Sequence, residues 1–125
     1  MNDKLDRLND IKVENFIWII YIGIILLSWY ANSKEKNFIL YNDNKSKKEY
    51  QGLMILIFSI LLIVYLYFTK DSYNDIKKLC KYDSKKKRDL TYASFIGSLL
   101  ITISGIIFLI IAITDDNIDT EIAFN

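Results

Sequence analysis

Hydrophobic residues gather into three long runs along this chain, and polar residues lie between the runs and at both ends. The runs cover residues 15–31, 50–69 and 90–114, and the last holds 25 residues without a charge. As a helix, this last run would be about 37 Å long, which exceeds a hydrocarbon core of about 30 Å. Lipid offers the backbone no hydrogen bonds, so each run should form a helix that pairs its own backbone groups. The pattern predicts an all-α membrane protein with three transmembrane helices in a small bundle.

The polar segments complete what we expect to be a single membrane domain. They are an N-terminal segment at 1–14, an outer loop at 32–49, a basic loop at 70–89 and an acidic tail at 115–125. None of them contains an apolar stretch that is long enough to span a bilayer.

The basic loop carries a pattern that is typical of a helix start. Ser72 and Asp75 have the spacing of a capping box, and an apolar stripe follows them at helical spacing. We therefore expect a short surface helix at about 72–82, between the second and third transmembrane helices.

Positive charges are distributed unevenly between the two sides that three spans define. Segments 1–14 and 70–89 share one side and carry eleven Lys and Arg, whereas the other two segments carry five. The positive-inside rule places the first side, with the N-terminus, in the cytoplasm and the C-terminus outside. The composition is rich in Ile, Lys, Asn and Tyr, which suggests AT-biased coding and a multi-pass protein of a bacterial cell membrane.

A cluster of four basic residues directly precedes the third run. It consists of Lys85, Lys86, Lys87 and Arg88. Such a cluster acts first as a topology determinant, and it also attracts anionic lipid headgroups at about 1 kcal/mol per charge. Recognition of anionic lipid is therefore an alternative role for this part of the chain.

Small residues collect on one side of the third predicted helix. At about 100° per residue they fall within one half of its circumference. The predicted packing residues are Ala93, Ser94, Gly97, Ser98, Thr102 and Gly105. Small side chains let another helix approach closely, and hydroxyls can bond across such a contact. This face therefore predicts packing within the chain, on a membrane-protein partner or on a second copy.

The composition argues against catalysis and against bound cofactors. The chain has no His and one Cys, so it lacks an imidazole base, a His metal ligand and any multi-Cys zinc site. Residues 16–31, 52–69 and 90–114 contain no Asp, Glu, Lys or Arg of the kind that transporters use at depth. The net charge of +1 creates no field that would recruit nucleic acid. We expect no enzyme activity, no catalytic residue, no cofactor and no metal.

Two classes of membrane function remain beside lipid recognition. The first is a structural or interaction subunit, or adaptor, that packs through the third helix in the bilayer. The second is an oligomeric pore former, because the chain resembles three-span holins in size. That resemblance is limited to size, since holins usually place the N-terminus outside and a basic tail inside. The charge order of this chain is the reverse.

Overall fold

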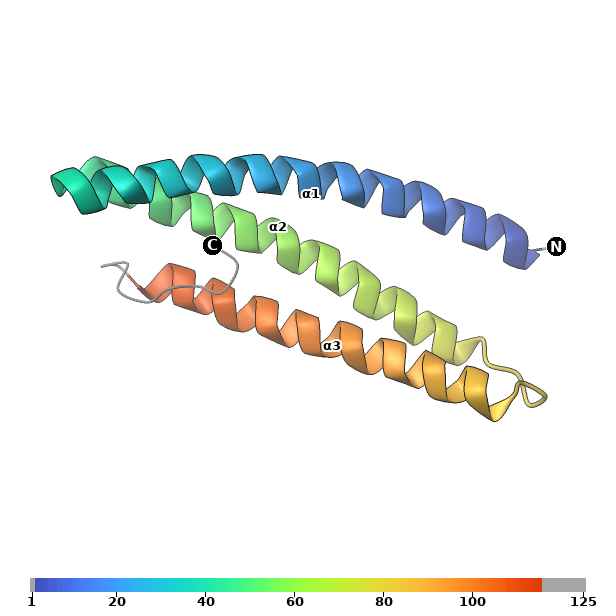
Figure 1. Cartoon of the computed structure of the whole chain (residues 1–125). Helices are drawn as coiled ribbons and strands as arrows, with labels where there is room; N and C mark the ends of the chain where they lie inside the picture. The colour runs from blue at the N-terminus through green and yellow to red at the C-terminus, as the bar shows by residue number, and fades with distance from the viewer. Residues whose placement is uncertain (1, 116–125) are drawn as a thin grey trace. The chain divides into compact units, whose positions relative to one another are not determined.

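The computed structural model describes residues 2–115 of the chain. Within this range it contains three α-helices and no strand: α1 (Asn2–Tyr41), α2 (Asn44–Lys77) and α3 (Lys85–Thr114) (Figure 1). Each helix is long and apolar enough to cross a membrane. This confirms the all-α class with three candidate spans and indicates a multi-pass membrane protein. Residues 116–125 of the predicted acidic tail lie outside the described range.

The helices extend well beyond the hydrophobic runs that predicted them. Helix α1 has 40 residues and continues without a break through the charged segment 2–14. The sequence contains no proline, so nothing in its backbone chemistry interrupts a helix at the edge of an apolar run. The membrane therefore sets where each apolar run ends, but it does not set where each helix ends.

A sharp turn at Asn42 and Asp43 joins α1 to α2, so most of the predicted outer loop is helical. Asn42 adopts the left-handed conformation, with φ of 51°, which Asn tolerates better than most residues. Asp43 then caps α2, because its carboxylate accepts from the Lys45 N–H at 3.1 Å and from the Ser46 hydroxyl at 2.8 Å. These hydrogen bonds, the one from Ser46 first, lower the pKa of the Asp43 carboxyl.

The short surface helix predicted at about 72–82 is wrong. Helix α2 continues past Ser72 and ends at Lys77, and residues 78–84 form turns that lead to α3. Ser72 does not cap a helix; it is buried, and its hydroxyl lies 3.1 Å from the Ser98 hydroxyl of α3. No helix breaker stands between the second apolar run and Ser72, so the two predicted helices form one.

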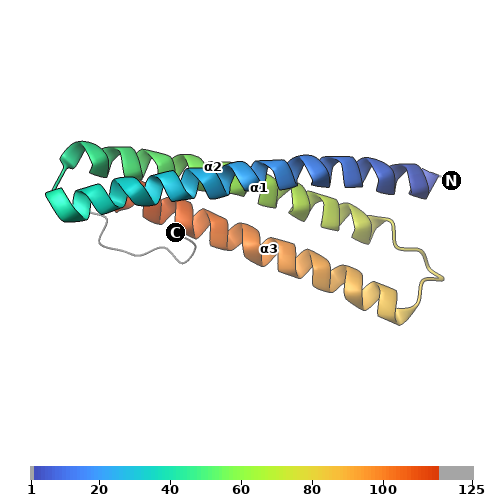
Figure 2. The same cartoon turned by 45° about the horizontal axis from the view of Figure 1, so that its top comes forward.

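The chain separates into two compact parts. The first part, up to Leu53, contains α1 and the start of α2, and Lys34 pairs there with Glu49 at 2.8 Å. The second part, from Met54 onward, contains the rest of α2 and α3. In this part α2 and α3 run in opposite directions (Figures 1 and 2), with contacts that extend from Phe58–Phe108 to Tyr73–Phe95.

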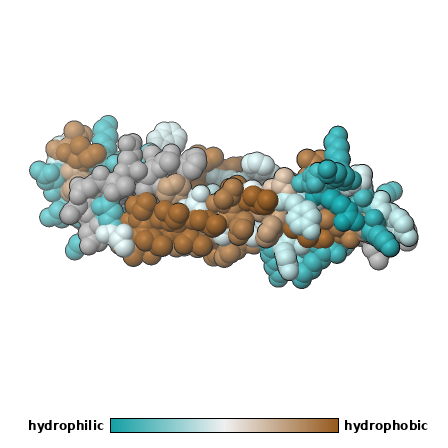
Figure 3. Space-filling model, turned by 90° about the horizontal axis from the view of Figure 1, so that it is seen from below, coloured by the Kyte–Doolittle hydropathy of each residue, from teal (hydrophilic) through white to brown (hydrophobic). Residues whose placement is uncertain are grey.

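The outer surface of α3 is strongly apolar. On the face shown in Figure 3, hydrophobic side chains form a band, and hydrophilic side chains gather beyond it near the start of α3. Leu100 and Ile107 are 59% and 51% exposed. An apolar surface of this extent is typical of a helix that faces lipid or another protein, not water.

Candidate helix-packing site

Helix α3 packs on α2 through a seam with a seven-residue repeat. Residues along this seam are buried or half-buried and recur at alternating steps of four and three. They are Thr91, Phe95, Ser98, Thr102, Gly105, Leu109 and Ala112. This average period of 3.5 is the spacing of left-handed helix pairs, which is the commonest packing in membrane bundles.

Two threonines form the polar centre of the seam. The Oγ1 atoms of Thr69 on α2 and Thr102 on α3 lie 2.6 Å apart. Each hydroxyl also lies within 3.1 Å of two backbone carbonyl oxygens, those of Tyr65 and Ser98. Each hydroxyl has a single proton. One threonine therefore donates to the other, and the second donates to a carbonyl, which satisfies both groups without water.

Close approach of the two helices occurs at Gly105, one turn further along α3. Gly105 is buried, and a Cβ atom added there would lie 3.0 Å from Cδ2 of Tyr65 and 3.6 Å from Cδ1 of Leu62. Contacts as short as 3.0 Å are tighter than ordinary van der Waals packing. Glycine at this position therefore allows the Tyr65 ring to lie directly on the α3 backbone.

The six predicted packing residues divide into two groups. Ser98, Thr102 and Gly105 contact α2. Ala93 and Ser94 are exposed, and nothing lies within 4 Å of the position that a Cβ atom of Gly97 would take. Ala93 and Gly97 project about a third of a turn away from the α2 seam. We refer to Ala93, Gly97 and the exposed Ser104 as the open small face.

The four basic residues at the start of α3 have different surroundings. Ser84 caps the helix and accepts from the Lys87 N–H at 3.1 Å, and the Lys87 ammonium pairs with Asp83 at 3.2 Å. Arg88 donates to the Cys80 carbonyl at 2.6 Å. Lys85 and Lys86 are exposed.

Asp83 holds the turn before α3 in place. Its carboxylate accepts from the Cys80 N–H at 2.6 Å as well as from Lys87. The hydrogen bond from Cys80 and then the one from Lys87 lower the pKa of the Asp83 carboxyl. Half of the predicted basic cluster, Lys87 and Arg88, is thus used in ordering this turn.

The partner residues on α2 were not predicted from the sequence. Tyr65, Thr69 and Ser72 are the residues that meet the hydroxyls and the glycine of α3. The spacing of Thr69 and Ser72, three residues apart at the end of an apolar run, indicates that both hydroxyls lie on one side of α2. The charges from Lys70 onward obscure it, because they predict a loop directly after the apolar run.

Comparison of the chain with protein-family models, with curated proteins and with solved structures finds no match in any of the three. Within residues 2–115, no group of three or more His, Cys, Asp or Glu side chains is arranged to hold a metal ion. A function for the chain must therefore be inferred from the geometry of α2 and α3.

Proposed function

We propose that this protein is a small membrane subunit that packs on a partner transmembrane helix through the open small face of α3. The main support is the division of the small residues of α3 into two groups. The residues of one group contact α2. In the other group, Ala93 is exposed and Gly97 has open space at its Cβ position. A helix that needed small residues only for its own hairpin would not need the second group.

The chemistry of the open small face favours a helix as its partner. Ala93 and Gly97 have small-x3-small spacing, and Ser104 follows Gly97 after seven residues on the same side of the helix. Without bulky side chains, a second backbone can approach closely and gain van der Waals contact. The exposed Ser104 hydroxyl supplies one polar group for such a contact.

A pore is the less favoured alternative. A water path along α3 would need the hydroxyls of Ser94, Ser98 and Thr102 to face it. The Ser98 and Thr102 hydroxyls bond to α2, so only Ser94 of the three is exposed. This arrangement supports packing over conduction.

The distribution of Lys and Arg supports an orientation with the turn between α2 and α3 in the cytoplasm. Eight Lys and Arg lie between residues 70 and 89, and none follows the apolar run of α3. This is the pattern that the positive-inside rule associates with a cytoplasmic connection. A partner would then meet the open small face in the cytoplasmic half of the bilayer or at its surface.

The mass of the complex purified in mild detergent tests the proposal. We expect the wild-type chain to purify with a stoichiometric partner, either a second copy or another membrane protein. Gly97→Leu should reduce the mass to that of the free chain, because the leucine side chain holds the partner backbone away. Gly23→Leu is the matched control, since Gly23 on α1 also has nothing within 4 Å of its Cβ position.

The two variants together separate a specific contact from a general effect. If Gly97→Leu and wild type give the same mass, the open small face does not carry the contact. If Gly23→Leu lowers the mass equally, the loss reflects added bulk in any span. A wild-type chain that purifies as a monomer also contradicts the proposal.

A further inference from the structure

The open small face belongs to a longer stripe on α3 with the same seven-residue repeat as the α2 seam. At alternating steps of four and three, the stripe consists of Lys86, Leu90, Ala93, Gly97, Leu100 and Ser104. None of these residues belongs to the α2 seam, and Leu90 and Leu100 are 60% and 59% exposed. An average period of 3.5 lets a second helix follow the stripe over its whole length. The stripe therefore has the pattern of a second helix seam that α2 does not use.

The first turns of this stripe lie outside the hydrocarbon of the membrane. Thr69, the last residue of the α2 apolar run, donates to the Ser98 carbonyl at 3.0 Å. A membrane boundary closer to the start of α3 would draw Lys70 and Asp71 into hydrocarbon, which is strongly unfavourable. With the boundary at Ser98, Leu90 stands about 12 Å outside the hydrocarbon, past a headgroup layer of about 5–8 Å. Lipid does not reach an apolar side chain there, so only a protein partner can cover Leu90.

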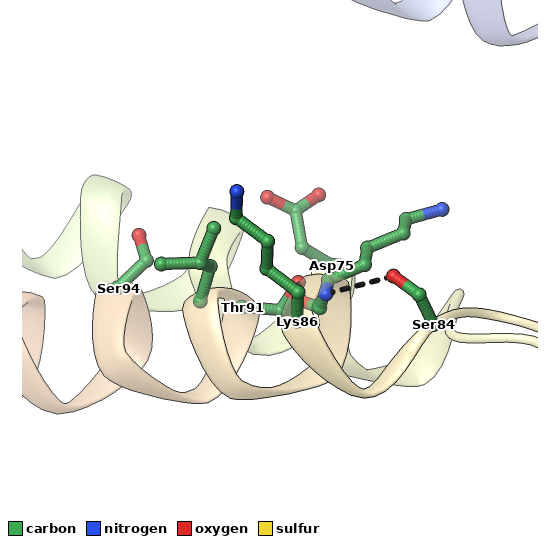
Figure 4. A pocket seen from close by; sticks show the side chains of 7 residues that line it. Asp75, Ser84, Lys86, Thr91 and Ser94 are labelled. Carbon is green, nitrogen blue, oxygen red and sulfur yellow. Dashed lines mark hydrogen bonds between the residues drawn. The ribbon is translucent and has the colours of Figure 1, made fainter.

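Two charges of opposite sign lie beside the start of the stripe. Asp75 of α2 and Lys86 line an open groove that also includes Leu90, and their charged groups lie on the same side of α3 (Figure 4). Within the described residues, neither of these two side chains takes part in an ion pair. The neighbouring Lys87 is instead paired with Asp83 at 3.2 Å. A partner on the stripe therefore meets one carboxylate on α2 and one ammonium on α3.

We infer that the partner on the open small face is a second copy of this chain, related to the first by a two-fold axis normal to the membrane. This inference rests on the proposed packing function and names its partner. Two copies inserted in the same orientation place each residue of the stripe at the depth of its counterpart, so Leu90 meets Leu90 of the second copy and Gly97 meets Gly97. A two-fold contact must be self-complementary. The groove meets this condition, because Lys86 of each copy pairs with Asp75 of the other.

Native mass spectrometry of two charge-reversal variants of the full chain, mixed in mild detergent with tags of different mass, tests this inference. Asp75→Lys leaves only positive charges at the two positions and Lys86→Asp only negative ones, so each variant alone should dimerise more weakly than wild type. The mixed dimer regains both opposite-charge contacts, and its association constant should exceed that of either single-variant dimer by about tenfold. Lys81→Asp is the control, because Lys81 is exposed on the same connector and does not line the groove. Mixed with Asp75→Lys, it should give no such preference.

Three outcomes would overturn the inference. Equal association constants for the mixed and single-variant dimers would mean that Asp75 and Lys86 do not pair across the two-fold axis. A mixed-dimer preference that persists when both variants also carry Gly97→Leu would place the contact between copies away from the open small face. A wild-type complex of one copy with a different protein would exclude the second copy as the partner, while the proposed packing function would stand. A wild-type chain that is monomeric would contradict both proposals, so the two failures can be told apart.

Discussion

At the scale of single residues, the contact between Thr69 and Thr102 is the most specific feature of the α2–α3 seam. The two hydroxyls lie 2.6 Å apart, and each can also reach the same pair of carbonyl oxygens. Hydrogen bonds of this kind between membrane helices contribute about 0.6 kcal/mol on average, because the separated helices find other partners. The pair therefore specifies the register more than it stabilises the fold.

Substitution of the two threonines by valine, singly and together, measures this contribution. Each single variant should lose less than about 1 kcal/mol, because the remaining hydroxyl still donates to a carbonyl. The double-mutant cycle should give a coupling of about 0.6 kcal/mol in a reversible unfolding measurement in detergent or bilayers. Strictly additive losses would show that the two hydroxyls do not act as a pair.

At the scale of elements, the apolar runs predicted the number and class of the helices but not their ends. Charged segments such as 2–14 and 70–77 contain no proline or glycine that would stop a helix. Hydropathy changes at the membrane boundary, whereas helical structure continues past it. Helix ends are therefore marked by caps, such as Asp43 and Ser84, which are short signals that are easily confused with loop residues.

The register between α2 and α3 was also beyond prediction from the sequence. The small residues of α3 were visible as one broad face, but nothing in that pattern showed which of them α2 covers. The choice depends on side-chain pairs on both helices, in particular Thr69 with Thr102 and Tyr65 with Gly105. Part of the candidate site could thus be predicted from the sequence of α3 alone. Its partner residues on α2 became apparent only from the structure of the two helices together.

Gly105→Leu tests the packing of the hairpin at the element scale. A leucine at this position must displace the Tyr65 ring, which lies 3.0 Å from the Cβ position, and overpacking of this kind typically costs about 1–3 kcal/mol. Gly97→Leu should not lower the stability of the free chain, since nothing lies within 4 Å of its Cβ position. Equal unfolding free energies for the two variants, measured on the free chain, would be inconsistent with the observed seam.

At the scale of the whole molecule, three candidate spans and a basic connection between α2 and α3 set the position of the proposed packing site. The three helices are candidate spans because of their length and apolar composition. The proposed cytoplasmic side of the connection follows from the distribution of Lys and Arg. If the connection between α2 and α3 lay outside, the partner would meet the open small face on the opposite side of the bilayer.

Labelling of Cys80 with a membrane-impermeant maleimide tests this arrangement most directly. Cys80 is the single cysteine of the chain, and it is exposed in the connection between α2 and α3. In bacteria that express the protein, we predict labelling in sealed inside-out vesicles and none in right-side-out vesicles. Ser33→Cys in a Cys80→Ser background should show the reverse, because Ser33 is exposed near the other end of the spans. Labelling of Cys80 from the outside, or of both positions from one side, would contradict the three-span arrangement with a cytoplasmic connection.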